Sequence, residues 1–216
     1  MDDMKLWFME KEAVYSTLAL FYRGSLSRGL KILRGTDLLE KLFKWENNLT
    51  VCRKAAIILG EINGNHLNPK YKEELLEDYQ RLFIGPGHIL APMWESVYES
   101  KDRLIFGKSQ LSVRKFYGEF GLGVSPKEPA DHLAFELFFM ARLCDVKMDD
   151  DLQNIVKALS AMEKFLKDHL CKWVPSWRDC VNSSAKTRFW IEFSNMTEGW
   201  IMDNLEEIKE IRRLVL

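Results

Sequence analysis

The apolar residues of this 216-residue chain recur mostly at the spacing of an α-helix. Val14, Leu18 and Phe21 share one helical face near the start of the chain. The same period marks two further helices, one through Leu152, Ile155, Val156, Leu159, Met162 and Leu166 and one through Ile201, Leu205, Ile208 and Ile211. Convincing strand alternation is absent, so the pattern predicts an all-α fold.

Helix-breaking residues predict where one helix begins and ends. Asn68 is a favoured N-cap and Pro69 a favoured first residue, so a helix is expected from there. It should end near Phe83, because Gly85 tolerates positive φ and Pro86 lacks a backbone donor. The pattern therefore predicts a long Gly/Pro loop after this helix.

Two more helix starts follow from the same reasoning. Ser109 is predicted to cap a helix that Gly121 ends, and Pro129 to open the next one, which runs to about Asp145. That last segment is apolar nearly all round, as expected for a helix at the centre of a bundle. We therefore expect residues 1–216 to form a single-domain helical bundle, with the Gly/Pro loop between two central helices.

Composition excludes several classes of protein. The chain is 47% hydrophobic with a formal charge of −1 and no lysine/arginine tract, which argues against nucleic-acid binding. No segment has the length of a signal peptide core or a membrane span, so we expect a cytoplasmic protein without stable membrane insertion. The four cysteines show no CxxC spacing and are expected to be free thiols.

The segment from Glu77 to Tyr98 carries large apolar residues on a loop beside acidic ones. Four acids and one base, Arg81, lie between Glu77 and Glu99, a local charge of −3. An apolar loop with acidic surroundings suits a basic, apolar peptide. The alternative is that these side chains only cover the core beneath a long connection.

Residues 128–136 combine three carboxylates with one histidine and no lysine or arginine. If they are helical, Glu128, His132 and Glu136 fall four residues apart on one face. The segment could then be a metal site, a capped helix start or a polar binding site, although the Glu-x-x-His pattern of helical di-iron sites is absent. Asp131 and His132 are the candidate acceptor and donor. The other histidines are His88 in the loop, and His66 and His169, which we interpret as ordinary polar positions.

No motif indicates catalysis. The segment Phe106-Gly-Lys-Ser109 looks like the end of a phosphate loop, but the pattern requires glycine at position 102, where Asp102 stands. A turn at Gly107 and a helix cap at Ser109 explain these residues instead. No Ser-His-Asp order, nucleophile elbow or paired catalytic carboxylates are recognisable.

Together, the two segments resemble the TorD/DmsD family of cytoplasmic chaperones for molybdenum oxidoreductases, also called redox enzyme maturation proteins. Residues 79–86, YQRLFIGP, and 92–98, PMWESVY, are similar to the family's first motif, and residues 128–133, EPADHL, to its second. Residues 109–122 and 165–175 give further similarity. The resemblance covers roughly residues 70–177, and Met93 departs from it where the family often has a second proline.

The resemblance implies an all-α chaperone that binds the twin-arginine signal peptide of a molybdopterin oxidoreductase, prevents its premature export and assists cofactor insertion. The residues matching the family's signal-peptide site are Tyr79, Leu82, Phe83, Pro92, Trp94, Asp131 and His132, with Glu95 and Glu128 as a supporting acidic rim. Leu82, Phe83 and Trp94 would make apolar contacts. Asp131 would pair an arginine, because guanidinium groups favour carboxylates.

The resemblance also implies partners and alternatives. The folded oxidoreductase and the twin-arginine export machinery are implied partners. Weak guanine nucleotide binding and helix-exchanged dimers occur in the family, whereas no cofactor of the chain's own is expected. The alternatives are an assembly chaperone of a non-exported nitrate-reductase-type subunit, a generic helical interaction module, and a nucleotide hydrolase at residues 107–109 that Lys108→Ala would inactivate.

Overall fold

The computed structural model describes residues 2–35, 38–43, 49–65, 68–99, 103–145 and 152–215. Within these ranges the secondary structure is helical and no strand forms, which confirms the predicted all-α fold. The nearest approach to a strand is an isolated antiparallel bridge between Trp94 and His132. Among the helices in these ranges, none is long and apolar enough to cross a bilayer. Cys52, Cys144, Cys171 and Cys180 are free thiols, as predicted.

Contacts along the chain divide it into two compact units. The first unit comprises residues 1–23, 94–173 and 201–216, and the second comprises residues 24–93 and 174–200. The chain therefore leaves and re-enters each unit. Residues 77–98 span the division before residue 94, whereas residues 128–136 lie entirely in the first unit. The expectation of one domain stays a prediction.

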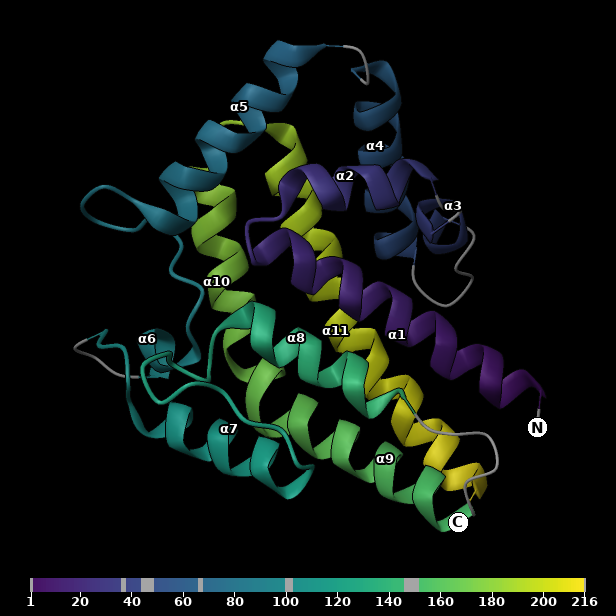
Figure 1. Cartoon of the computed structure of the whole chain (residues 1–216). Coiled ribbons are helices and arrows are strands. Elements are labelled where there is room, and N and C mark those ends of the chain that lie inside the picture. Colours follow the sequence, from purple (N-terminus) through teal and green to yellow (C-terminus); the bar gives the residue numbers. More distant parts are fainter. Residues whose placement is uncertain are drawn as a thin grey trace. The chain divides into compact units, whose positions relative to one another are not determined.

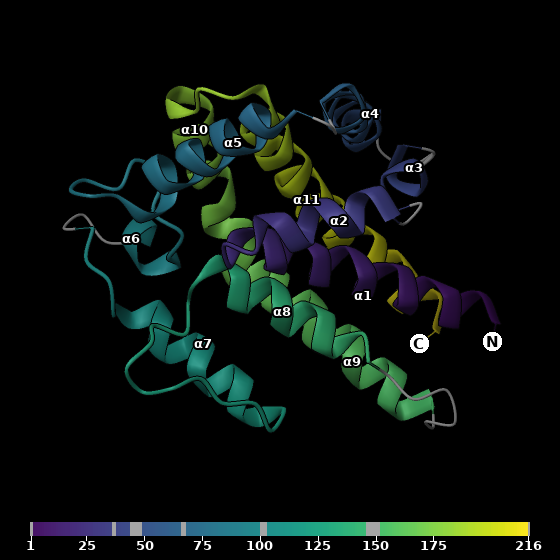
Figure 2. The same ribbon diagram turned by 45° about the horizontal axis from the view of Figure 1, so that its top comes forward.

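The first unit is built from long and short helices. Its elements are α1 (Asp2–Tyr22), α6 (Glu95–Glu99), α7 (Lys108–Glu119), α8 (Leu133–Leu143), α9 (Leu152–Phe165), a π-helical turn at Leu166–Leu170, the start of α10 (Cys171–Ser184) and the end of α11 (Arg188–Val215). Helix α8 packs along α1 and against α9 (Figures 1 and 2). Its apolar surface is thus covered on more than one side, as predicted for a central helix.

Buried polar contacts fix the ends of the chain within the first unit. The Tyr15 hydroxyl donates to Asn204 Oδ1 over 2.6 Å. Lys11, almost fully buried, pairs with Glu207 over 2.5 Å. Burial lowers the Lys11 pKa, although the neighbouring Glu207 carboxylate opposes this shift. Buried groups of this kind must find partners, and here the partners tie α1 to α11.

The second unit contains the remaining helices. These are α2 (Leu26–Gly35), α3 (Leu38–Phe43), α4 (Leu49–Gly64), α5 (Pro69–Tyr79) with a π-helical turn at Gln80–Ile84, and the other parts of α10 and α11. Asp78, at the end of α5, accepts hydrogen bonds from the backbone N–H groups of Lys186 and Thr187. One buried carboxylate therefore holds the turn that precedes α11.

The start of α5 is as predicted. The Asn68 side chain accepts a hydrogen bond from the Lys70 N–H, and Pro69 is the first helical residue. The helix continues as the π-helical turn to Ile84, and Gly85 ends it with φ +85°. A loop from Gly85 to Trp94 then leads to the short helix α6.

Two other predicted helix starts are wrong. Gly107, not Ser109, is the N-cap of α7, and Ser109 lies buried inside the helix. Helix α8 begins at Leu133 with His132 as its N-cap, four residues after the predicted start at Pro129. Glu128 and His132 therefore precede the helix, and the predicted helical face that joins them to Glu136 does not form. His66 lies outside the described residues.

Candidate functional site

Four of the predicted binding residues lie in the second unit and are buried there. Leu82 and Phe83 have no exposed surface, and Tyr79 retains 5%. The Tyr79 and Phe83 rings contact Trp190, with centroids 5.5 and 5.4 Å apart. Pro92 is also buried. The prediction that Leu82 and Phe83 present apolar surface to a peptide is therefore not met in this conformation, because both side chains form the core of the second unit.

In the first unit, Trp94 and His132 lie side by side on the surface. Their backbones form the antiparallel bridge, and their rings meet edge to face with centroids 5.3 Å apart. Both side chains are only partly buried. The first and second sequence motifs are therefore in direct contact at these two residues.

The aromatic surface extends to Phe135 and a surface ion pair. Phe135 is partly exposed, and its ring lies 5.7 Å from that of His132. The Arg23 guanidinium sits 4.6 Å from the centroid of Phe135 and 3.4 Å from Glu128 Oε1. We call Trp94, His132, Phe135, Arg23 and Glu128 the aromatic surface. It combines partly exposed rings with the Glu128 carboxylate, which forms an ion pair with Arg23; both of these side chains are about half exposed. Ion pairs this exposed contribute little stability.

His132 is held in one tautomer. Its Nδ1 accepts a hydrogen bond of 3.1 Å from the Ala134 N–H, so Nδ1 carries no proton and Nε2 is the ring donor. Burial, and secondly the positive charge of Arg23, lower the His132 pKa from 6.5 to about 4. The imidazole is therefore neutral at physiological pH.

Asp131 points into the protein rather than toward solvent. It is fully buried; its Oδ2 accepts a 2.8 Å hydrogen bond from the Ser96 N–H, and its backbone oxygen accepts one from the Glu95 N–H. Asp131 thus binds the first turn of α6, where N–H groups lack helical partners. Its Oδ1 has no hydrogen-bond partner within the described part of the chain. In this conformation an external arginine does not reach Asp131.

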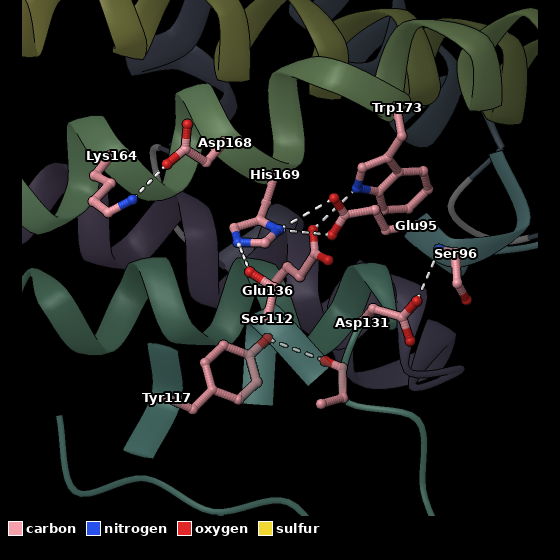
Figure 3. Close-up of polar contacts among 11 residues, drawn as sticks. Glu95, Ser96, Ser112, Tyr117, Asp131, Glu136, Lys164, Asp168, His169 and Trp173 are labelled. Carbon is pink, nitrogen blue, oxygen red and sulfur yellow. Dashed lines mark hydrogen bonds and ion pairs between the residues drawn. The ribbon is translucent and has the colours of Figure 1, made fainter. Parts of the chain in front are cut away.

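The first unit also contains a buried polar cluster, which we define as Glu95, Glu136, His169 and Trp173 (Figure 3). The exposed Ser112 lies at its edge. His169 Nδ1 lies 2.9 Å from Glu95 Oε2, and its Nε2 lies 3.4 Å from the Ser112 hydroxyl. Trp173 Nε1 donates to Glu136 Oε2 over 3.1 Å. The cluster joins α6, α7, α8 and the start of α10 through side chains.

Two sequence predictions are wrong at this cluster. Glu95 was expected on an acidic rim, yet it has no exposed surface because its carboxylate faces His169. His169 was expected to be an ordinary polar position, but it is buried, with its ring 4.9 Å from that of Phe165. Glu128 is the rim carboxylate that does remain partly exposed.

Burial determines the charge state of the two glutamates. It raises the pKa of Glu95, while the hydrogen bond to His169 opposes the rise. It raises the pKa of Glu136 well above its usual value, and repulsion from Glu95 and Asp131 adds to the rise. Three carboxyl groups this close cannot all ionise in a dry interior, so Glu136 is the one that keeps its proton.

The order Ser112–His169–Glu95 superficially matches a hydrolase triad. However, Ser112 lies within α7, where backbone N–H groups are used by the helix and none is left to stabilise an oxyanion next to the hydroxyl. The 3.4 Å contact is also long for activation of a nucleophile. Across the described ranges, no group of three histidine, cysteine or acidic side chains is arranged to hold a metal ion. The cluster is therefore interpreted as a structural support.

Comparison with known proteins identifies the family. Residues 48–179 match the family model described as nitrate reductase delta subunit, which is more than half of the chain. The chain belongs to this family. The matched region contains both sequence motifs, the bridge between Trp94 and His132 and the whole buried polar cluster.

Several proteins that are similar in sequence to this chain are named as chaperones. The chain is 25% identical over 141 residues to "Chaperone protein TorD" of Psychrobacter sp., covering 64% of this chain and 63% of that protein. It is 27% identical over 138 residues to "Probable Tat proofreading chaperone DmsD" of Haemophilus influenzae, covering 61% and 63%. A TorD of Vibrio cholerae is 24% identical over 190 residues, 86% of each chain.

These matches confirm the predicted resemblance to the TorD/DmsD family. The alignments with the Psychrobacter and Haemophilus proteins span a little less than two thirds of each of those proteins. Within this family member, the sequence identified Trp94, Asp131 and His132 as neighbours but missed Phe135 and Arg23. Phe135 could have been found as a large aromatic residue two positions after the second motif. Arg23 is more than a hundred residues before this motif in the sequence and gives no local signal.

Proposed function

We propose that this protein is a cytoplasmic, non-enzymatic chaperone that binds the twin-arginine signal peptide of a molybdopterin oxidoreductase, delays its export and assists cofactor insertion and folding. Relatives named as TorD chaperones and Tat proofreading chaperones support the general role. The observation that supports the peptide-binding part is the aromatic surface, where partly exposed rings lie beside the half-exposed carboxylate of Glu128 in the first unit.

Each part of the aromatic surface suits a part of such a peptide. A twin-arginine leader joins two arginines to an apolar segment, and Trp94 and Phe135 supply apolar and cation-binding faces. Glu128 is the carboxylate we assign to a peptide arginine, because its present partner Arg23 is surface-exposed and contributes little stability. The incoming guanidinium would take the place of Arg23 on Glu128.

His132 and Asp131 have different roles in this proposal. The neutral His132 offers its Nε2–H as a donor to a peptide carbonyl. Asp131 positions Trp94 by fixing the start of α6, and it does not itself contact the arginine. Tyr79, Leu82, Phe83 and Pro92 support the loop before Trp94 from inside the second unit.

The test is calorimetric titration with a synthetic twin-arginine leader and a twin-lysine control. Wild-type protein should prefer the arginine peptide, because guanidinium binds a carboxylate in bidentate geometry and stacks on rings better than ammonium does. Glu128→Gln should reduce this preference. Glu163→Gln, at another half-buried carboxylate paired with an arginine, is the matched control and should not. Equal binding of both peptides, or a preference unchanged in Glu128→Gln, would contradict the proposal.

A second candidate function is an assembly chaperone for a non-exported nitrate-reductase-type subunit. The description of the matching family supports it. It predicts binding of a peptide from such a subunit that lacks paired arginines, at the same aromatic surface. Competition between the two peptides for one protein would decide which client class it prefers.

A further inference from the structure

A second exposed apolar surface lies at the start of α7, away from the residues used above. Leu104, Ile105 and Phe106 follow one another in the loop before this helix and are 64%, 40% and 53% exposed. Leu111, in the first turns of α7, is 63% exposed. Phe106 and Leu111 occupy the two positions around a helix N-cap whose side chains commonly pack together. Four large apolar side chains at one helix start exceed the scattered single ones that need no explanation.

The backbone of this loop is strained at two residues and is closely packed at its base. Arg103 and Phe106 have φ of +51° and +69°, and no other non-glycine residue in the described ranges has positive φ. For a bulky residue such as phenylalanine this conformation is unfavourable. At the base of the loop, a Cβ on Gly107 would lie 3.1 Å from the Ser96 Cβ, so the backbone is seated closely against α6. Strain that persists at exposed residues indicates a functional reason for the conformation.

The charges around these side chains are nearly all positive. Between residues 103 and 119 the chain has four bases and one acid, a local charge of +3 in a protein whose net charge is −1. Arg114 is occupied by the backbone oxygens of Val124 and Glu128. Arg103, Lys108 and Lys115 are exposed. The apolar side chains are therefore accompanied by cationic side chains, whereas a basic leader peptide would require acidic ones.

We propose that Leu104, Ile105, Phe106 and Leu111, with Arg103, Lys108 and Lys115, form a lipid-binding surface that attaches the protein reversibly to an anionic bilayer. Consecutive apolar side chains on a loop can enter the headgroup region without a matching groove, and lysine and arginine are attracted to anionic lipid. An acidic protein segment is the other class of partner, but it would need a shaped groove to contact side chains that project from a loop. This inference does not depend on the proposed peptide site.

The test is sedimentation of the full chain with vesicles of phosphatidylcholine, with and without phosphatidylglycerol. Binding should require phosphatidylglycerol and should weaken with added salt. Lys108→Glu changes the surface charge by two units and should reduce partitioning about 25-fold, at about five-fold per charge. Lys5→Glu, at an exposed lysine of α1, is the control. It makes the same change in overall charge and should reduce partitioning by no more than about five-fold.

Phe106→Asn separates lipid binding from folding. Asparagine tolerates positive φ, so thermal unfolding should occur at the same or a higher temperature while lipid binding falls at least about ten-fold. Leu152→Ser is the matched control, since Leu152 is 56% exposed in α9 of the same unit, and it should not change lipid binding. No sedimentation with anionic vesicles would overturn the proposal. So would equal sedimentation with both lipids, or binding unchanged in a folded Phe106→Asn protein, and an acidic protein segment would then be the partner to test.

Discussion

The aromatic surface and the buried polar cluster both draw residues from the same two short segments, yet these residues have opposite environments. The outward side chains are Trp94, His132 and Phe135, and the inward ones are Glu95, Asp131 and Glu136. Neighbours in sequence therefore alternate between solvent and core. Each residue with an outward ring is next in sequence to a residue whose carboxyl group is buried.

The two sequence motifs therefore contain two kinds of residue. The inward carboxyl groups hold α6 and α8 through hydrogen bonds such as those of Asp131 to the start of α6. The rings of Trp94 and Phe135 make no such hydrogen bond to a helix start, whereas His132 also caps α8. Substitutions on the two sides should consequently separate stability from peptide binding.

Glu95→Ala should have the largest effect, on the free energy of unfolding. It leaves His169 without its carboxylate partner and opens a gap beside Glu136 in a dry interior, so we expect a loss of ~3 kcal/mol or more. Urea unfolding followed by circular dichroism measures it. Glu99→Ala, at an exposed position of the same short helix, is the control and should cost under ~0.5 kcal/mol. Equal losses would show that the cluster does not support the fold.

Trp94→Ala should act on peptide affinity. A tryptophan at the centre of a binding surface commonly contributes ~2 kcal/mol or more, so affinity for a twin-arginine leader should fall at least about thirty-fold. Because Trp94 is partly exposed, the unfolding midpoint should move much less than in Glu95→Ala. Calorimetry and thermal unfolding of the same sample compare the two. Intact affinity in the folded variant would remove the aromatic surface from the proposed function.

His132→Asn should change how stability depends on pH. The folded-state pKa of His132 is lowered from 6.5 to about 4, so its contribution is complete above pH 6.5 and is lost as pH falls toward 4. Asparagine caps a helix without titrating in this range. Between pH 7 and pH 4.5 the wild type should therefore lose ~1–2 kcal/mol more stability than the variant. Parallel curves from urea unfolding would contradict a His132 that stays neutral in the folded protein.

Glu136→Gln should have the smallest effect on stability at low pH, and its effect should grow as the pH rises. The folded-state pKa of Glu136 is raised, so the unfolded chain ionises first as pH rises above about 4.5 and the wild type loses stability. Glutamine resembles the protonated acid and can still accept from Trp173. At pH 5 the two proteins should agree within ~0.5 kcal/mol, and the variant should become relatively more stable toward pH 8. A relative loss with rising pH would show that Glu136 is ionised in the folded protein.

A local signal in the sequence predicted the start of α5 correctly. Asn68 and Pro69 start α5 as expected because an N-cap depends on the next few residues alone. The start of α8 was misplaced because Asp131 and His132 are held by the Trp94–Ser96 segment, some 35 residues away, so that the helix begins only at Leu133. A proline favours a helix start but cannot reveal such a tertiary contact.

The site shows the same division. The TorD/DmsD resemblance brought Trp94, Asp131 and His132 together correctly, since both motifs meet at the bridge. It could not show which side chains face outward, so Glu95 was assigned to a rim. His169 was overlooked because its partner Glu95 lies 74 positions earlier and no local pattern joins them. The direction in which a side chain points, and its pairing with residues far away in the sequence, depend on tertiary packing, which a single sequence does not display.

A double-mutant cycle between Glu128 and the peptide tests the central claim most directly. Calorimetry would compare wild type and Glu128→Gln, each with the twin-arginine leader and with a leader in which one arginine is lysine. If Glu128 receives that arginine, the two changes should be non-additive, with a coupling energy of ~0.5 kcal/mol or more. Additive losses at both arginine positions, with the variant folded, would show that the exposed carboxylate of the aromatic surface is not where the signal peptide binds.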